Sequence, residues 1–249
     1  MPEISASRYV VHAGWDDVPH LDEQTKAELL ASTPPHLREA RSKGTPSLGS
    51  GAIYPIPWEE VTCHPFRIPD FWKRGYAMDV GWNKTAAMWG AQDPADGVLY
   101  AYSEHYMGQA LPVVHAQSIK ARGEWIRGAI DPASRGRSQS DGKKLLTSYK
   151  QAGLKLTLAN NAVETGLYEV WSLLMTGRLK IFTTLRNTAD EYAIYQRDEH
   201  GKVVKKNDHL MDCLRYLIMT WKLIGTLRPA ERIAGDVTSA GPADRLSGY

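Results

Sequence analysis

A carboxylate stands inside an apolar run near the middle of the chain, and this placement constrains the fold strongly. Residues 75–81 read Gly-Tyr-Ala-Met-Asp-Val-Gly, an alternation of large and small side chains that is typical of a strand. A charged Asp79 in such a strand is costly unless it is paired or bound to a metal ion. The run therefore predicts a strand that brings Asp79 to a cation.

The neighbouring segments predict the rest of the architecture. Residues 85–90 and 98–106 read as two more strands, joined by the turn-forming residues 93–97, so an antiparallel meander is expected. Strands and helices then alternate: helices at 112–127, 142–152, 162–176 and 184–192, and strands at 128–131, 154–159 and 179–182. The last element is an amphipathic helix from about 208 to 223, preceded by a hairpin at 193–204. This order predicts an α/β fold with a mixed sheet flanked by helices.

The chain divides into three parts by composition. Residues 1–73 are rich in turn-forming residues and read as an N-terminal extension or linker. Residues 74–225 form the predicted domain, and residues 226–249 read as a flexible tail. No secretion signal and no apolar run of about 20 residues is present, so we expect neither secretion nor membrane insertion but a cytoplasmic protein.

Bulk charge and cysteine content exclude some functions. The net charge is +2, so any contact with nucleic acid must come from local basic patches. Cys63 and Cys213 are far apart and form no C-x-x-C pair, so neither a zinc site nor a disulfide framework is expected.

Three further carboxylates occupy positions like that of Asp79. Asp131 closes the apolar run Gly-Ala-Ile, and Asp208 and Asp212 share one face at the start of the last helix. Taken singly, each has an ordinary explanation: a turn, a salt bridge or, for Asp208, a helix N-cap. Taken together, they are the oxygen ligands that Mg²⁺ or Mn²⁺ prefers, and two-metal phosphodiester hydrolysis needs such a cluster.

Four stretches of the chain resemble the nuclease domain of the large terminase subunit of tailed bacteriophages. They are Y-A-M-D-V-G-W at 76–82, A-I-D-P-A at 129–133, T-G-L with T-G-R-L-K-I at 165–181, and K-N-D-H-L-M-D-C-L-R-Y at 206–216. The last is similar to a D-H-x-x-D-A-x-R-Y motif, with Cys213 in place of Ala. The resemblance covers about 74–223, and residues 49–55 also resemble the segment that joins the family's ATPase and nuclease domains.

The resemblance implies a ribonuclease-H-like fold and a metal-dependent endodeoxyribonuclease. Such an enzyme uses two Mg²⁺ or Mn²⁺ ions to cut concatemeric viral DNA during genome packaging, with little sequence specificity. The implied partners are double-stranded DNA, the small terminase subunit and the portal protein, in the host cytoplasm. No G-x-x-x-x-G-K-[S/T] is present, so ATP hydrolysis by this chain is not expected.

The motifs carry the family's site residues onto this chain. Asp79 and Asp131 match the first two metal ligands. The third ligand is Asp208 or Asp212, a choice that the sequence leaves open. His209 between them is a further candidate ligand, and pairing with Asp212 is the expected role of Arg215.

Basic residues near these motifs are candidate DNA contacts, because lysine and arginine bind phosphates without reading sequence. For the stretch 134–144, which follows Asp131, a solvated basic loop explains the residues equally well. The candidates are Lys84, Arg135, Arg137, Lys143, Lys144, Lys205 and Lys206.

Two other functions fit the same residues. One is another ribonuclease-H-like nuclease, such as a resolvase or an integrase-like transferase, which activity on branched DNA would reveal. The other is a non-catalytic DNA-binding or motor-docking module with a structural acidic cluster. In that case Asp79→Asn would leave every activity unchanged.

Overall fold

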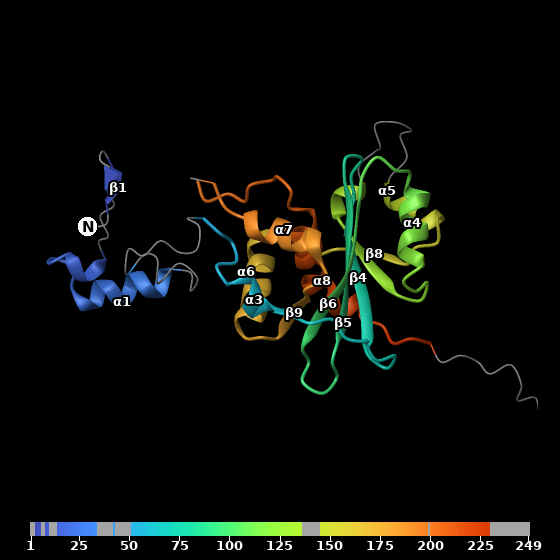
Figure 1. Cartoon of the computed structure of the whole chain (residues 1–249), viewed down its shortest axis with the longest axis horizontal. Coiled ribbons are helices and arrows are strands. Elements are labelled where there is room, and N and C mark those ends of the chain that lie inside the picture. Colours follow the sequence, from blue (N-terminus) through green and yellow to red (C-terminus); the bar gives the residue numbers. More distant parts are fainter. Residues whose placement is uncertain are drawn as a thin grey trace, which may run out of the picture.

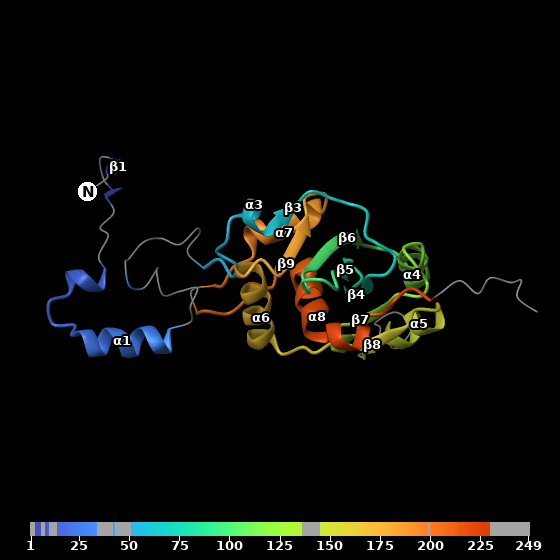
Figure 2. The same ribbon diagram turned by 90° about the horizontal axis from the view of Figure 1, so that it is seen from below.

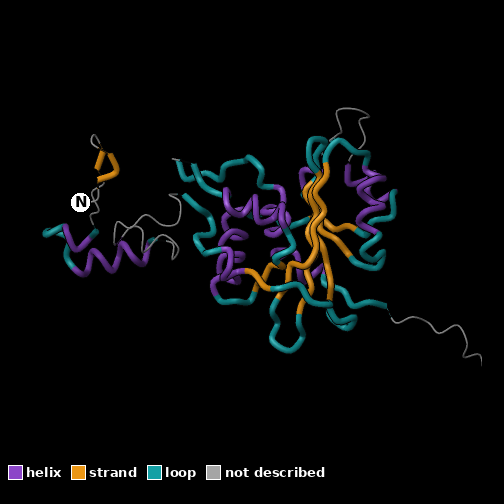
Figure 3. Tube along the Cα trace, in the orientation of Figure 1, coloured by secondary structure: helices purple, strands orange, loops and turns teal. Residues whose placement is uncertain are grey.

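The computed structural model describes residues 3–5, 8–9, 14–33, 42, 51–135, 145–198 and 200–229. A mixed sheet lies between two layers of helices, with α3, α6, α7 and α8 on one side and α4 and α5 on the other (Figure 1; Figure 3). Figure 2 shows α8 lying against the sheet. The predicted α/β class with a mixed sheet and flanking helices is confirmed. The N-terminal part contains β1 (Glu3–Ser5), β2 (Arg8–Tyr9), η1 (Trp15–Asp17) and α1 (Glu23–Ser32).

The main sheet has seven strands in the order β3-β9-β6-β5-β4-β7-β8. Their bounds are Thr62–Cys63 (β3), Lys73–Asp79 (β4), Thr85–Gln92 (β5), Leu99–Met107 (β6), Arg127–Ile130 (β7), Leu156–Leu158 (β8) and Leu179–Phe182 (β9). The predicted meander is present, because β5 pairs antiparallel with both β4 and β6. The other pairs are parallel, among them β4 with β7 and β7 with β8.

Helix α8 (His209–Ile224) positions the functional edge of the sheet. It packs on β4, β5 and β7 and is covered in turn by α6 (Val163–Met175) and α7 (Arg186–Ile194). Its buried apolar side chains include Leu210, Leu214 and Leu217, which are spaced to share one face. Burying each large side chain contributes roughly 1.5–3 kcal/mol, so the sheet and this one helix supply much of the core.

The opposite face of the sheet carries α4 (Pro112–Lys120) and α5 (Leu145–Gln151), which cover a second apolar cluster. The helix predicted to reach residue 127 ends at Lys120, because the chain turns at Gly123, where φ is 135°. The predicted hairpin before α8 is present as a single antiparallel bridge between Arg197 and Val203. The 3₁₀ turn η2 (Pro132–Arg135) follows β7.

Residues 51–72 lie against the main sheet. They include α3 (Trp58–Val61) and the edge strand β3, which pairs with β9. Their buried apolar side chains are Ile53, Tyr54, Ile56, Val61, Ile68 and Trp72. These side chains complete the same core as the strands, while a domain boundary at residue 74 stays a prediction. Among the described residues, no helix is long and apolar enough to span a membrane.

Two buried histidines, one on β6 and one on α4, predict a loss of stability in acid. His105 Nε2 lies 2.9 Å from His115 Nδ1. Burial lowers the pKa of His105 to about 4, helped by repulsion from Arg122 and from His115 whenever that is protonated, and burial also lowers the pKa of His115. Both stay neutral when folded but bind protons below about pH 6.5 when unfolded. The free energy of unfolding should therefore fall by about 2 kcal/mol as the pH drops from 6.5 towards 4.5.

Urea unfolding at several pH values measures this effect. The matched control is His105→Leu/His115→Met, which removes both titrating groups and should flatten the dependence over this pH window. Equal slopes for the two proteins would contradict the assignment.

Candidate metal-binding active site

The ends of β4 and β7 bring two of the predicted carboxylates together. The strands are parallel neighbours with Met78 opposite Ile130, and the next residues are Asp79 and Asp131. The Asp131 amide donates to the Met78 carbonyl oxygen at 3.1 Å, which extends the pairing to this position. Residues 79 and 131, far apart in sequence, thus lie side by side at one edge of the sheet.

The first turns of α8 face the same edge. His209 Nδ1 lies 2.7 Å from Asp79 Oδ2. Two turns further along, the Tyr216 hydroxyl donates to Asp131 Oδ1 at 3.1 Å. Each strand-end carboxylate is therefore oriented by a side chain from α8.

Asp208 and Asp212 are neutralised by cationic side chains. Lys205 Nζ lies 2.9 Å from Oδ2 of both carboxylates. Arg215 Nη2 lies 2.8 Å from Asp212 Oδ1, as its sequence position predicted, and Arg215 is 1% exposed. Gly166 of α6 gives the arginine its space, because a Cβ there would lie 2.5 Å from Arg215 Cγ. Asp212 is thus fixed by two cations, whereas Asp208 meets one.

The electrostatics of the edge are those of crowded, partly desolvated charges. Burial raises the pKa of Asp79, and repulsion from Asp212 and Asp131 adds to this, against the hydrogen bond from His209. The hydrogen bond to Asp79 raises the pKa of His209. Burial lowers the pKa of Lys205, but its hydrogen bonds to Asp212 and Asp208 outweigh burial, so its pKa is raised. These pKa shifts are those of an acidic centre whose carboxylates are paired with cationic side chains of the protein.

The donor chemistry of the centre fits a hard divalent cation, although the ligands are not gathered around one point. Among the described residues, no three His, Cys, Asp or Glu side chains form a group that could hold a metal ion. The Lys205 ammonium instead stands between two carboxylates, where a positive charge is favoured. Carboxylate oxygens are the ligands that Mg²⁺ and Mn²⁺ prefer, so the chemistry of these side chains fits such an ion.

Glu191 is a residue that sequence reasoning missed. It lies on α7, is 2% exposed, and its Oε2 accepts from the Leu210 amide at 2.6 Å and the Met211 amide at 3.3 Å. It therefore caps α8 from another helix. Asp208 was expected to act as a side-chain cap, but no such hydrogen bond is present. Because Glu191 satisfies the helix terminus, the carboxylate of Asp208 is left for Lys205.

Replacing Glu191 by Ala should destabilise the protein by about 1–3 kcal/mol, because two buried amides at a helix start lose their acceptor. Urea unfolding measures the change. Glu191→Gln keeps an acceptor oxygen and should lose less. The control is Glu169→Ala on the exposed face of α6, for which we expect a change within about 0.5 kcal/mol. An unchanged midpoint for Glu191→Ala would contradict the capping role.

The candidate DNA contacts lie around the same edge where the structure describes them. Lys84 immediately precedes β5, with Nζ 4.1 Å from the centre of the Tyr106 ring. Lys206 is exposed beside the paired Lys205. Arg135 ends η2, which follows Asp131 directly. Arg137, Lys143 and Lys144 lie outside the described residues.

Comparisons with known proteins agree with the fold. No family model matches the chain. It is 34% identical over 238 residues to the terminase large subunit of Salmonella phage P22, covering 90% of this chain and 46% of that protein. The chain thus spans about half the length of the curated relatives it matches. A solved large terminase from a thermophilic bacteriophage has 23% identity and a TM-score of 0.60, over 86% of this chain and 56% of that one, and shows the fold alone.

A second solved structure corresponds to the described sheet and helices. The nuclease domain of the P22 large terminase is 31% identical, with a TM-score of 0.64, and the match covers 73% of this chain and 97% of that domain. Because nearly the whole of that domain is matched at this identity, the chain belongs to the family of nuclease domains of phage large terminase subunits.

Proposed function

We propose that this chain is a metal-dependent endonuclease that cuts concatemeric viral DNA during genome packaging, with little sequence specificity. The observation that carries the proposal is the pairing of Asp79 and Asp131 at the ends of adjacent parallel strands. Because β4 and β7 are parallel, these two residues, which are far apart in sequence, lie at the same end of the strands, next to α8. Family membership supports the same activity.

Asp212 is the better third ligand in this proposal. The charges of Asp212 and Asp131 raise the pKa of Asp79, so Asp212 lies close to the strand-end carboxylates. Two cations fix the orientation of Asp212, so its position is well defined. Asp208 then serves as an outer partner of Lys205, and His209 holds Asp79 rather than binding the ion directly.

The residues of the chain would divide the chemical work. When bound, two Mg²⁺ or Mn²⁺ ions would activate a water and stabilise the leaving 3′ oxygen. Asp79, Asp131 and Asp212 hold the ions, His209 orients Asp79, and Tyr216 orients Asp131. Lys205 neutralises Asp208 and Asp212.

The wider biological setting belongs to the proposal as well. The relatives are named as terminase large subunits, so we propose double-stranded DNA, the small terminase subunit and the portal protein as partners. The host cytoplasm is the corresponding location. The predicted nuclease unit of residues 74–225 is proposed to include residues 51–72 as well, because these complete its core, and the remaining residues form an extension and a tail.

Plasmid digestion tests the activity directly. The protein should nick and linearise supercoiled plasmid with Mn²⁺ or Mg²⁺ and without ATP, and excess EDTA should stop it. A branched DNA substrate should be cut no faster than linear duplex, whereas marked preference for branches would favour a resolvase. Folded protein that cuts no DNA with either ion would overturn the proposal.

A further inference from the structure

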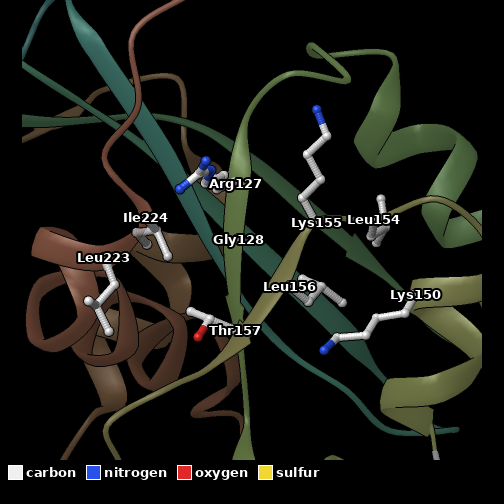
Figure 4. A pocket seen from close by; sticks show the side chains of 9 residues that line it. All are labelled: Arg127, Gly128, Lys150, Leu154, Lys155, Leu156, Thr157, Leu223 and Ile224. Atoms are coloured by element: carbon white, nitrogen blue, oxygen red, sulfur yellow. The ribbon is translucent and has the colours of Figure 1, made fainter.

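A groove opens near the edge strand β8, at the end of β7 where that strand begins. Asp131 follows the other end of β7. The groove has a volume of about 570 Å³ and lies between the starts of β7 and β8, α5 and the C-terminal end of α8. Figure 4 shows the side chains around it. Its floor is apolar, made by the buried residues Leu154, Leu156 and Ile224.

Three cationic side chains surround this floor. Arg127 begins β7, Lys150 comes from α5, and Lys155 immediately precedes β8 (Figure 4). All three are exposed, and within the part of the chain that the structure describes no carboxylate forms a salt bridge with them. Lys120 and Glu124 line a small adjoining cavity with Lys155, so the surroundings keep a net positive charge. Uncompensated cations from three elements favour a polyanion.

We propose that this groove binds the phosphate backbone of duplex DNA at a distance from the cleaved bond. The proposal rests on the proposed function. Arg127 and Asp131 are separated by the length of β7, about 13 Å at roughly 3.3 Å per residue. A duplex that runs alongside β7 presents several phosphates between Arg127 and Asp131, since it carries one charge per about 1.7 Å. The groove would hold the duplex while its backbone reaches the acidic centre.

The geometry favours DNA over an acidic protein segment. A peptide could add to the open edge of β8, but this strand has three residues and offers a short ladder. Lysine next to an edge strand also discourages pairing with another strand. Contacts of lysine and arginine with phosphate oxygens carry no sequence information, which suits contact with any DNA sequence.

Binding of labelled duplex DNA to the full chain in EDTA tests the groove without cleavage. Lys150→Gln/Lys155→Gln should weaken binding about tenfold or more at low salt. It should also reduce the slope of log K against log salt by about 1.8, at roughly 0.9 for each lost phosphate contact. The control Arg67→Gln/Arg178→Gln removes two exposed cations near β9, on the far side of the sheet, and should change neither quantity.

The outcomes separate this proposal from the proposed function. Unchanged DNA affinity and salt slope in Lys150→Gln/Lys155→Gln would overturn the proposal that the groove binds DNA, even if metal-dependent cutting remains. Unchanged DNA affinity with lost binding of a polyglutamate peptide would overturn it in favour of an acidic protein partner. Loss of cutting in Asp131→Asn with normal DNA binding in EDTA supports the separation of holding from cleavage.

Discussion

Replacing Asp79 or Asp131 by Asn is expected to reduce metal-dependent DNA cleavage by on the order of a thousandfold, because each change removes a charged ligand from the centre and a bound metal supplies several kcal/mol of transition-state stabilisation. Asn has nearly the shape of Asp, so packing at the strand ends should be retained. Asp79 is half-buried and is repelled by Asp131 and Asp212, and Asn can still bond to His209, so its neutralisation should cost the fold little. The loss is therefore expected in cleavage rather than in stability.

Initial rates of plasmid nicking at saturating Mn²⁺ measure this effect, with urea unfolding of each variant as the folding check. Asp96→Asn is the matched control, because it makes the same change in the turn between β5 and β6, at the other end of these strands. Its rate should equal that of the unmodified protein. Either strand-end variant cutting at more than a tenth of that rate would contradict its role as a metal ligand.

The same assay decides between Asp208 and Asp212. Asp212→Asn should match the loss seen for Asp79→Asn, while Asp208→Asn should keep most activity. Calorimetric titration with Mg²⁺ gives an independent readout, because only loss of a ligand weakens binding strongly. If Asp208→Asn loses more cleavage activity than Asp212→Asn, then Asp208 is the third metal ligand and Asp212 is the outer partner of Lys205.

The core of the site could be predicted because local patterns report it. Asp79 and Asp131 each interrupt or close an apolar run, and strand alternation marks such positions without any knowledge of the fold. The parallel pairing of β4 with β7 then places the two residues at one edge, as βα alternation implies. The meander of β4, β5 and β6 is equally local, since short turns join its strands.

The interactions that orient the site could not be read in this way, because they depend on contacts between distant segments. Glu191 resembles any acidic residue of an amphipathic helix until α7 packs against the start of α8. Lys205 read as an exposed basic residue available for DNA, whereas the fold directs it to Asp208 and Asp212. The turn-rich composition of residues 51–72 concealed apolar side chains that are buried by β9 and α7.

That buried segment carries the second large expected effect. A chain that begins at residue 74 should be unfolded or nearly so in the absence of urea, whereas one that begins at residue 51 should fold. The shorter chain loses six buried apolar side chains: Ile53, Tyr54, Ile56, Val61, Ile68 and Trp72. At roughly 1.5–3 kcal/mol each as an upper range, their burial is comparable to the whole stability of a typical domain, about 5–15 kcal/mol.

Hydrogen bonds join the same segment to the C-terminal end of α7 and to the sheet. The Ile53 amide donates to the Tyr195 carbonyl, the Tyr192 hydroxyl donates to the Ile56 carbonyl, and the Thr183 amide donates to the Cys63 carbonyl beyond the end of β9. Circular dichroism and urea unfolding of the two shortened chains measure the difference. The full chain with Val61→Ala is an intermediate control, since one buried side chain truncated to Ala in an otherwise complete core should cost about 2–4 kcal/mol and leave a folded protein. A cooperative transition of the chain from residue 74 at the same urea concentration as the chain from residue 51 would show that the folded unit begins at residue 74 after all.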